Sequence, residues 1–310
     1  MTMPRRPDRQ RLDGIWLPLV TPFLNGKLDE ESLATLTFHY ATSPIAGLIV
    51  AATTGEALTL EPEEIGAAVA VTAGVTGGRM PIYLGLSGSN TARLVKALAT
   101  SSEWPIQGYL IACPYYTRPS QEGLRQHFTA LAGATDKPVL LYNIPYRTGV
   151  NLANETLFRL AELRNIVGVK DCCADPAQSF ELLRGRPADF AVLTGEDTDF
   201  FGALAQGADG GILASAQIDP EAFVEIRRSL LAGDRPDALR RWCALLDVVR
   251  LLFAEPSPAP IKYWLWREGL IRSPELRLPM TGVSGALAAR ITRAIASRRP
   301  ANVSPAEAFA

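Results

Sequence analysis

Residues 138–170, PVLLYNIPYRTGVNLANETLFRLAELRNIVGVK, contain two apolar runs separated by a segment with helical periodicity. The runs are Pro138–Tyr142 and Ile166–Lys170, and the helical segment is Asn154–Leu163. Parallel strands need a long crossover between them, and a helix usually supplies it. The stretch therefore predicts one strand–helix–strand unit, with Lys170 at the C-terminal tip of a buried strand.

The same pattern extends over most of the chain. Eight apolar runs are predicted strands: Gly14–Thr21, Gly47–Val50, Pro81–Gly85, Gly108–Ala112, Pro138–Tyr142, Ile166–Lys170, Phe190–Thr194 and Gly210–Leu213. The helices predicted between them include Glu30–Tyr40, Pro62–Ala73, Asn90–Thr100, Gln121–Ala134, Asn154–Leu163 and Pro176–Arg184. Eight such units in about 220 residues predict a closed (β/α)8 barrel, the TIM barrel of the α/β class. An open doubly wound sheet is the alternative, but it would normally carry a glycine-rich loop where Thr21-Pro22-Phe23 stands.

Beyond the eighth run the pattern changes to helices alone. These are predicted at Glu221–Leu231, Arg235–Ala254, Ile261–Glu268 and Gly285–Ala296. We expect a flexible segment at residues 1–12, the barrel at 13–233, a C-terminal helical extension at 234–298 and a flexible tail at 299–310.

The composition excludes several functional classes. Lys and Arg total 31 against 32 for Asp and Glu, so the chain has no basic field for nucleic acid. No run approaches the roughly 18 apolar residues of a membrane span, and the basic N-terminus lacks the apolar stretch of a signal peptide. The cysteines (Cys113, Cys172, Cys173 and Cys243) show no metal-ligand spacing and are predicted to be reduced thiols. We expect a cytoplasmic protein whose ligands are small molecules.

Lys170 is the first candidate for catalysis. Taking an ammonium out of water is costly, so a buried lysine lowers its pKa and becomes a nucleophilic amine, as in imine-forming enzymes. The alternative is a lysine that extends from the strand end to solvent. Tyr142 ends the preceding strand, where its phenol could exchange a proton with that amine. A buried tyrosine bonded to the backbone is the alternative there.

Other polar residues follow the predicted strands on the face where active sites of such barrels lie. Thr53, Thr54 and Gly55 offer hydroxyls and backbone N–H groups to a carboxylate, although the threonines could instead cap a helix. Arg147 lies in a proline-containing loop, where its guanidinium could bind a substrate carboxylate or remain at the surface.

The remaining ionisable residues receive structural interpretations. Asp171, Asp175, Glu196 and Asp197 are interpreted as groups that solvate loops and cap helices. His39 and His127 fall within predicted helices and are interpreted as surface or second-layer residues. None of these residues is predicted to bind a metal.

The motifs resemble those of the dihydrodipicolinate synthase / N-acetylneuraminate lyase family of pyruvate-dependent class I aldolases. The matching segments follow the family's order over nearly the whole chain: Thr21–Phe23, Thr53–Glu56, Pro114–Leu124, Tyr142–Gly149, Val167–Asp171 and Leu276–Pro279. The resemblance implies a barrel enzyme that forms an imine with pyruvate and needs neither a metal nor a cofactor.

Carried over by position, the resemblance implies a role for each site residue. Lys170 would form the Schiff base with the keto carbon of pyruvate, and Tyr142 would be the acid–base residue. Thr53 and Tyr116 would complete a proton relay, with Tyr116 supplied by a neighbouring subunit of a homotetramer built as a dimer of dimers. The residues that would bind pyruvate are Thr54, Gly55 and Ile212, the last through its carbonyl.

Arg147 favours the synthase branch of the family. In that branch this arginine binds the carboxylate of aspartate semialdehyde, so the resemblance implies condensation of pyruvate with that aldehyde in lysine biosynthesis. Ala52 and Tyr146 depart from the branch, since a glycine and a small residue are usual there. The alternative is another pyruvate aldolase or dehydratase of the same family, acting on a 2-keto-3-deoxy sugar acid or a similar 4-hydroxy-2-oxo acid. A barrel without catalysis also stays open. Arg93 stands where lysine-inhibited relatives carry a carboxylate.

Overall fold

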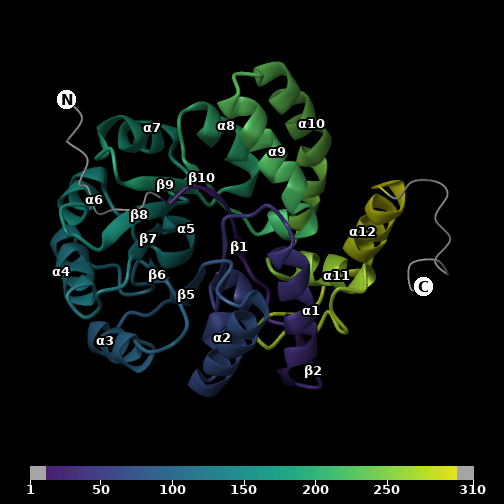
Figure 1. Ribbon diagram of the computed structural model, residues 1–310, viewed down its shortest axis with the longest axis horizontal. Coiled ribbons are helices and arrows are strands. Elements are labelled where there is room, and N and C mark those ends of the chain that lie inside the picture. Colours follow the sequence, from purple (N-terminus) through teal and green to yellow (C-terminus); the bar gives the residue numbers. More distant parts are fainter. Residues whose placement is uncertain (1–11, 299–310) are drawn as a thin grey trace.

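A closed barrel of parallel strands forms the centre of the computed structural model, which describes residues 12–298 (Figure 1). The predicted flexible ends, apart from residue 12, lie outside the described residues. Each barrel strand pairs with the next, and the last closes on the first: β1 (Gly14–Pro18), β4 (Gly47–Val50), β5 (Ile82–Leu86), β6 (Gly108–Ala112), β7 (Val139–Asn143), β8 (Ile166–Asp171), β9 (Ala191–Thr194) and β10 (Gly210–Ile212). The predicted (β/α)8 barrel is confirmed, and the predicted first strand is too long.

Helices cover the outside of the barrel. They are α1 (Glu30–Ala41), α2 (Pro62–Thr76), α3 (Thr91–Thr100), α4 (Gln121–Ala132), α6 (Asn154–Leu160), α7 (Pro176–Gly185), α8 (Phe200–Ala205) and α9 (Pro220–Leu231). Several begin at a side chain that accepts a backbone N–H, which replaces a bond that the first turn lacks. Asp29 caps α1, Asn90 caps α3, Ser120 caps α4 and Asp175 caps α7.

A short hairpin, which the apolar pattern did not predict, precedes α1. Its strands β2 (Phe23–Leu24) and β3 (Lys27–Leu28) are antiparallel, and each has only two residues. Asn25 and Gly26 connect them with φ angles of 54° and 78°. Both angles lie in the left-handed region that an Asn-Gly hairpin turn requires. Strands of this length contain too few residues to show an alternation.

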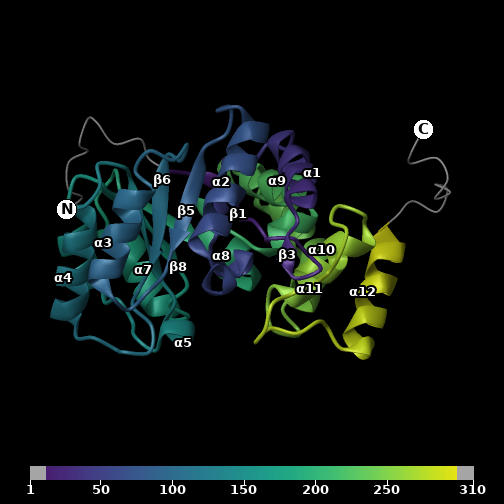
Figure 2. The ribbon, with the colours of Figure 1, turned by 90° about the horizontal axis from the view of Figure 1, so that it is seen from below.

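The C-terminal region consists of α10 (Arg235–Leu252), α11 (Ala259–Arg267) and α12 (Gly285–Arg298). Figures 1 and 2 place α11 and α12 at one side of the barrel, near α1. The division of the chain between residues 233 and 234 stays a prediction. Within residues 12–298, no helix is both long enough and apolar enough to cross a membrane.

The strands divide the buried side chains into two clusters. Side chains along a strand face opposite sides of the sheet in turn. In β6, Leu110 and Ala112 belong to the interior cluster of the barrel, whereas Tyr109 and Ile111 belong to the cluster under the helices. The register between β7 and β8 shifts after Val139, so that Leu140 pairs with Gly168 and Tyr142 pairs with Lys170. This alternation brings Lys170 into the barrel.

Candidate active site

Lys170 lies inside the barrel at the C-terminal end of β8. Its residue is 6% exposed, so the interpretation of a lysine extended into solvent is wrong. The Nζ lies 4.5 Å from the centroid of the Tyr142 ring, on the neighbouring strand. An ammonium over an aromatic face is partly stabilised by the ring, but this replaces only part of its hydration. The Lys170 amine thus lies in a largely buried site beside the Tyr142 phenol.

Gly195, directly after β9, gives Lys170 its space. A Cβ atom at Gly195 would overlap the Cε of Lys170 and the Sγ of Cys172. Any side chain at this position would therefore displace the lysine. The sequence analysis missed Gly195, and the only signal was a glycine that immediately follows a predicted strand.

Tyr142 is a buried phenol, and the side chain of Thr53 lies close enough to influence it. Burial raises the pKa of Tyr142 well above its ordinary value, because ionisation would place a charge in the barrel. The nearby positive charge of Arg147 and the Thr53 side chain act in the opposite direction. Tyr142 is thus a neutral hydroxyl that can both donate and accept a proton. Two of the three predicted relay residues, Tyr142 and Thr53, thus lie close together.

Thr53, Thr54 and Gly55 form a 3-10 turn after β4. The turn closes with a hydrogen bond of 3.0 Å from the Gly55 N–H to the Ala52 carbonyl. The Thr21 hydroxyl donates to the Gly55 carbonyl at 2.7 Å. A Cβ atom at Gly55 would lie 2.9 Å from the Leu19 carbonyl oxygen, so the close approach of β1 to the turn requires glycine. Thr54 is buried within this turn, while Thr53 is exposed.

Ala52 occupies the position before the turn without strain. Its φ is −87°, a value that any L-residue adopts, and the residue is buried in the barrel interior. On β5, Gly85 leaves space for the backbone of Ala51 and Ala52. The substitution of the family's usual glycine by alanine therefore leaves the turn intact.

Two predicted site residues lie at the rim. Tyr116 is 91% exposed and has a φ of 69°, and its N–H donates to the Thr148 carbonyl at 3.1 Å. Within this chain, its side chain does not extend into the barrel, and its placement in a neighbour's site stays a prediction. Arg147 is exposed on the short helix α5 (Pro145–Thr148), and its charge acts on Tyr142.

Ile212 ends β10 and is fully buried in the same interior cluster as Tyr142. Its position at the end of a barrel strand matches that of Lys170 on β8. The predicted pyruvate-binding residues thus lie in the turn after β4 (Thr54 and Gly55) and at the end of β10 (Ile212), and these strands are the two neighbours of β1 in the barrel.

Asp197 is a buried residue whose interpretation as a loop-solvating group is wrong. Its Oδ1 accepts the Ser215 N–H at 2.7 Å and the Ser215 hydroxyl at 2.6 Å. Burial raises the pKa of Asp197 to about 6, while the Ser215 hydrogen bonds and the charge of Lys170 oppose the increase. Asp197 is therefore a weak acid within electrostatic reach of Lys170. Its burial depends on the loop after β10, which no pattern near Asp197 reveals.

The other acidic residues and the histidines lie outside the barrel interior. Asp175 caps α7 as predicted, and Asp171 accepts hydrogen bonds from the Cys173 N–H and the Ser179 hydroxyl. His127 is buried against α3, where its Nδ1 lies 2.8 Å from the Thr91 hydroxyl. In the part of the chain that the structure describes, no three His, Cys, Asp or Glu side chains gather as metal ligands.

Comparisons with known proteins agree with this geometry. The model of the dihydrodipicolinate synthetase family matches residues 11–297. The chain is 43% identical to 4-hydroxy-tetrahydrodipicolinate synthase 2 of Clostridium acetobutylicum, over 91% of this chain and 99% of that protein. The solved dihydrodipicolinate synthase of Thermotoga maritima is 32% identical, with a TM-score of 0.90 over 93% of this chain and 99% of that one.

A further solved relative was determined with a small molecule bound. The chloride-inhibited dihydrodipicolinate synthase of Acinetobacter baumannii, complexed with pyruvate, is 33% identical, with a TM-score of 0.88 over 92% of this chain and 98% of that one. Sequence and fold thus agree over nearly the full length. The chain belongs to the dihydrodipicolinate synthetase family and is a lyase-type enzyme.

Proposed function

We propose that the chain is a 4-hydroxy-tetrahydrodipicolinate synthase that condenses pyruvate with L-aspartate 4-semialdehyde. The observation that carries the proposal is the buried Lys170 amine beside the Tyr142 phenol at the end of the barrel strands. The names of the relatives support the same reaction, and the Acinetobacter enzyme was solved with pyruvate. This chemistry requires no cofactor.

The reaction begins with a covalent bond between Lys170 and pyruvate. The neutral Nζ attacks the keto carbon, and the carbinolamine loses water to form a protonated imine. Tyr142, close to Thr53, supplies the proton that the departing oxygen takes up. The imine withdraws electrons from the methyl group, which loses a proton to the deprotonated Tyr142 oxygen to give an enamine. The enamine carbon then attacks the aldehyde carbon, and the aldehyde oxygen takes this proton from Tyr142.

The remaining predicted residues bind the two substrates. Thr54 offers its hydroxyl and its backbone N–H to the pyruvate carboxylate, while Gly55, whose N–H donates to the Ala52 carbonyl, shapes the turn. Ile212 lies on the other side of β1. Arg147, exposed at the rim, is placed to bind the carboxylate of the second substrate. The amine, the phenol and the two carboxylate sites then surround one reacting carbon.

The proposal includes the assembly of subunits. Tyr116, exposed on this chain, would enter the site of a neighbouring subunit and complete the relay through Thr53 and Tyr142. This arrangement requires at least a dimer, and we propose a homotetramer that is a dimer of dimers. We also propose that the enzyme works in the cytoplasm.

One observation favours a second candidate function. The Tyr146 hydroxyl donates to Glu196 Oε1 at 2.9 Å at the rim. A tyrosine and a carboxylate fixed there could bind substrate hydroxyls as well as narrow the entrance. The second candidate is therefore an aldolase or dehydratase that acts on a 2-keto-3-deoxy sugar acid, through the same Lys170 imine.

Borohydride reduction in the presence of pyruvate tests the proposed chemistry. The peptide that carries Lys170 should gain one reduced pyruvate, and Lys170→Ala should remove this labelling. Labelling of another lysine would refute the assignment of the imine to Lys170. No labelling at all would leave a barrel without this chemistry. Turnover with aspartate semialdehyde and with keto-deoxy sugar acids then separates the two candidate substrates.

A further inference from the structure

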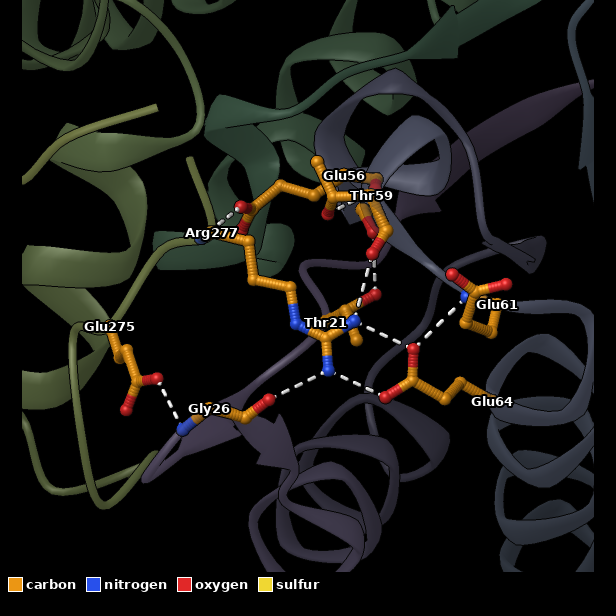
Figure 3. A network of polar contacts seen from close by, with 9 residues as sticks. Thr21, Gly26, Glu56, Thr59, Glu61, Glu64, Glu275 and Arg277 are labelled. Atoms are coloured by element: carbon orange, nitrogen blue, oxygen red, sulfur yellow. Dashed lines mark hydrogen bonds and ion pairs between the residues drawn. The ribbon is translucent and has the colours of Figure 1, made fainter. Parts of the chain in front are cut away.

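Glu56, directly after the Thr53–Gly55 turn, is a buried carboxylate that binds two parts of the C-terminal region, and Figure 3 shows its contact with Arg277. Its Oε1 accepts the Nζ of Lys262 on α11 at 2.7 Å, and the two side chains are 2% and 0% exposed. Its Oε2 accepts the backbone N–H of Arg277 at 3.1 Å. Both oxygens of one carboxylate are thus bound to residues that come more than 200 positions later.

The backbone of Glu56 belongs to the turn itself. Its N–H donates to the Thr53 carbonyl at 3.1 Å, so a displacement of Glu56 also displaces Thr53. Its φ of 53° lies in the left-handed region, which is unfavourable for a residue with a side chain. Such a conformation persists where surrounding contacts hold it. The two contacts to the Glu56 carboxylate are of this kind.

Arg277 fixes the same corner of the molecule through its side chain (Figure 3). Its guanidinium donates to both Glu64 oxygens, at 2.6 and 2.5 Å, and to the Thr59 carbonyl at 2.8 Å. Lys262 Nζ and Arg277 Cζ each lie 4.3 Å from the centroid of the Phe23 ring. The C-terminal region therefore binds the hairpin, α2 and the segment that follows the turn.

A contribution to folding stability alone does not explain a buried ion pair. Removing two charges from water costs about as much as their attraction returns, and apolar replacements are often equally stable. What a buried pair supplies is a fixed geometry, because leaving either charge unpaired is costly. Here the geometry that it fixes is that of the turn carrying Thr53 and Thr54.

We propose that Glu56 and Lys262 are positioning residues for the active site. Their ion pair holds the Thr53–Gly55 turn in place beside the Tyr142 phenol. The C-terminal region thereby controls the rate of proton transfer without contacting substrate. This inference rests on the proposed function, because it assigns Thr53 and Tyr142 to the relay.

Glu56→Gln tests the inference at constant side-chain volume. A carboxylate accepts through both oxygens, whereas an amide has one acceptor oxygen, so the variant loses either the Lys262 or the Arg277 contact. We expect kcat to fall roughly 10- to 100-fold, as for a small misplacement caused from outside the reacting groups. The solvent deuterium isotope effect on kcat should increase, because proton transfer becomes slower. Borohydride labelling of Lys170 after long incubation with pyruvate should still reach completion.

Asp29→Asn is the matched control. Asp29 is another buried carboxylate that binds the C-terminal region, since it accepts both Nε and Nη2 of Arg272. It caps α1 and does not contact the Thr53–Gly55 turn. The same chemical change should lower the melting temperature while leaving kcat and the isotope effect at the wild-type values.

The outcomes separate positioning from folding. Wild-type kcat in Glu56→Gln, or an equal decrease in Asp29→Asn, would overturn the inference. If Glu56→Gln does not fold, Glu56→Asp is the alternative test. Aspartate keeps the negative charge and both acceptor oxygens, but its side chain is one methylene group shorter, so we expect the same loss of kcat. If wild-type protein shows neither labelling nor turnover, the proposed function fails before any variant is compared.

Discussion

Gly195→Ala tests the geometry of the lysine site with a single methyl group. A Cβ atom at Gly195 would overlap Lys170 Cε and Cys172 Sγ, and the Gly195 backbone itself needs no left-handed conformation. The effect is therefore steric. Introducing a methyl group into such a packed position costs about 1–3 kcal/mol of unfolding free energy. Because the nearest atom belongs to Lys170, the lysine side chain should move.

The expected kinetic effect of Gly195→Ala is comparable in free energy with its effect on stability, because a 100-fold change in rate corresponds to about 2.7 kcal/mol. A displacement of about 1 Å at the nucleophile lowers kcat by roughly 100-fold. The assays are steady-state turnover and the rate of pyruvate-dependent borohydride labelling of Lys170. Both rates should fall together, since both require the amine to reach the keto carbon.

Gly74→Ala is the control for Gly195→Ala. Gly74 lies in α2, and a Cβ atom there would meet nothing within 4 Å. Alanine should raise the unfolding free energy by about 0.5–1 kcal/mol and leave turnover unchanged. The steric argument is refuted if Gly195→Ala labels Lys170 and turns over at the wild-type rates.

Three further predictions concern the rim and the subunit interface. Arg147→Ala removes a charged hydrogen-bond donor worth about 1.5–3 kcal/mol. The kcat/KM for aspartate semialdehyde should therefore fall about 10- to 100-fold, while pyruvate labelling of Lys170 persists. Equal decreases of kcat/KM for both substrates would contradict this role. Mixing inactive Tyr116→Phe with inactive Lys170→Ala subunits should restore activity, because a hybrid assembly contains one site in which both residues are intact. If the subunits exchange but no activity returns, the site is not shared between subunits. Arg93 lines a cavity with Leu58, Ser89 and Tyr115. Its positive charge repels the ammonium group of a free lysine, so lysine should inhibit the enzyme only weakly. Strong inhibition by sub-millimolar lysine would refute the assignment of this cavity as the inhibitor pocket.

Much of the lysine site could be predicted because it depends on local rules. Tyr142 and Lys170 end neighbouring parallel strands in the same phase of the side-chain alternation, so their meeting follows from strand order and register. Thr53 follows another barrel strand, and the C-terminal ends of all the barrel strands lie at one face of the barrel. These placements need only the recognition of eight strands.

The residues that escaped prediction depend on contacts across the fold. Gly195 matters because a side chain of the neighbouring strand occupies the space beside it. Asp197 is buried by the loop that carries Ser215. The partner of Glu56 is 206 residues away on α11, at a separation where no local pattern connects a glutamate with a lysine. The proposed role of Tyr116 in a relay requires a second subunit, which no pattern in one chain can position.

The Glu56–Lys262 pair has a consequence for the order in which the enzyme becomes active during its synthesis. The Thr53–Gly55 turn leaves the ribosome early, but the lysine that binds its following carboxylate is made 206 residues later. At about 5–20 residues per second, this interval lasts roughly 10–40 seconds. The barrel itself can close once β10 has been made, because β10 pairs with β1. A nascent chain can therefore complete its barrel before the C-terminal region secures the turn, so that catalytic competence comes only with the last segment of the polypeptide.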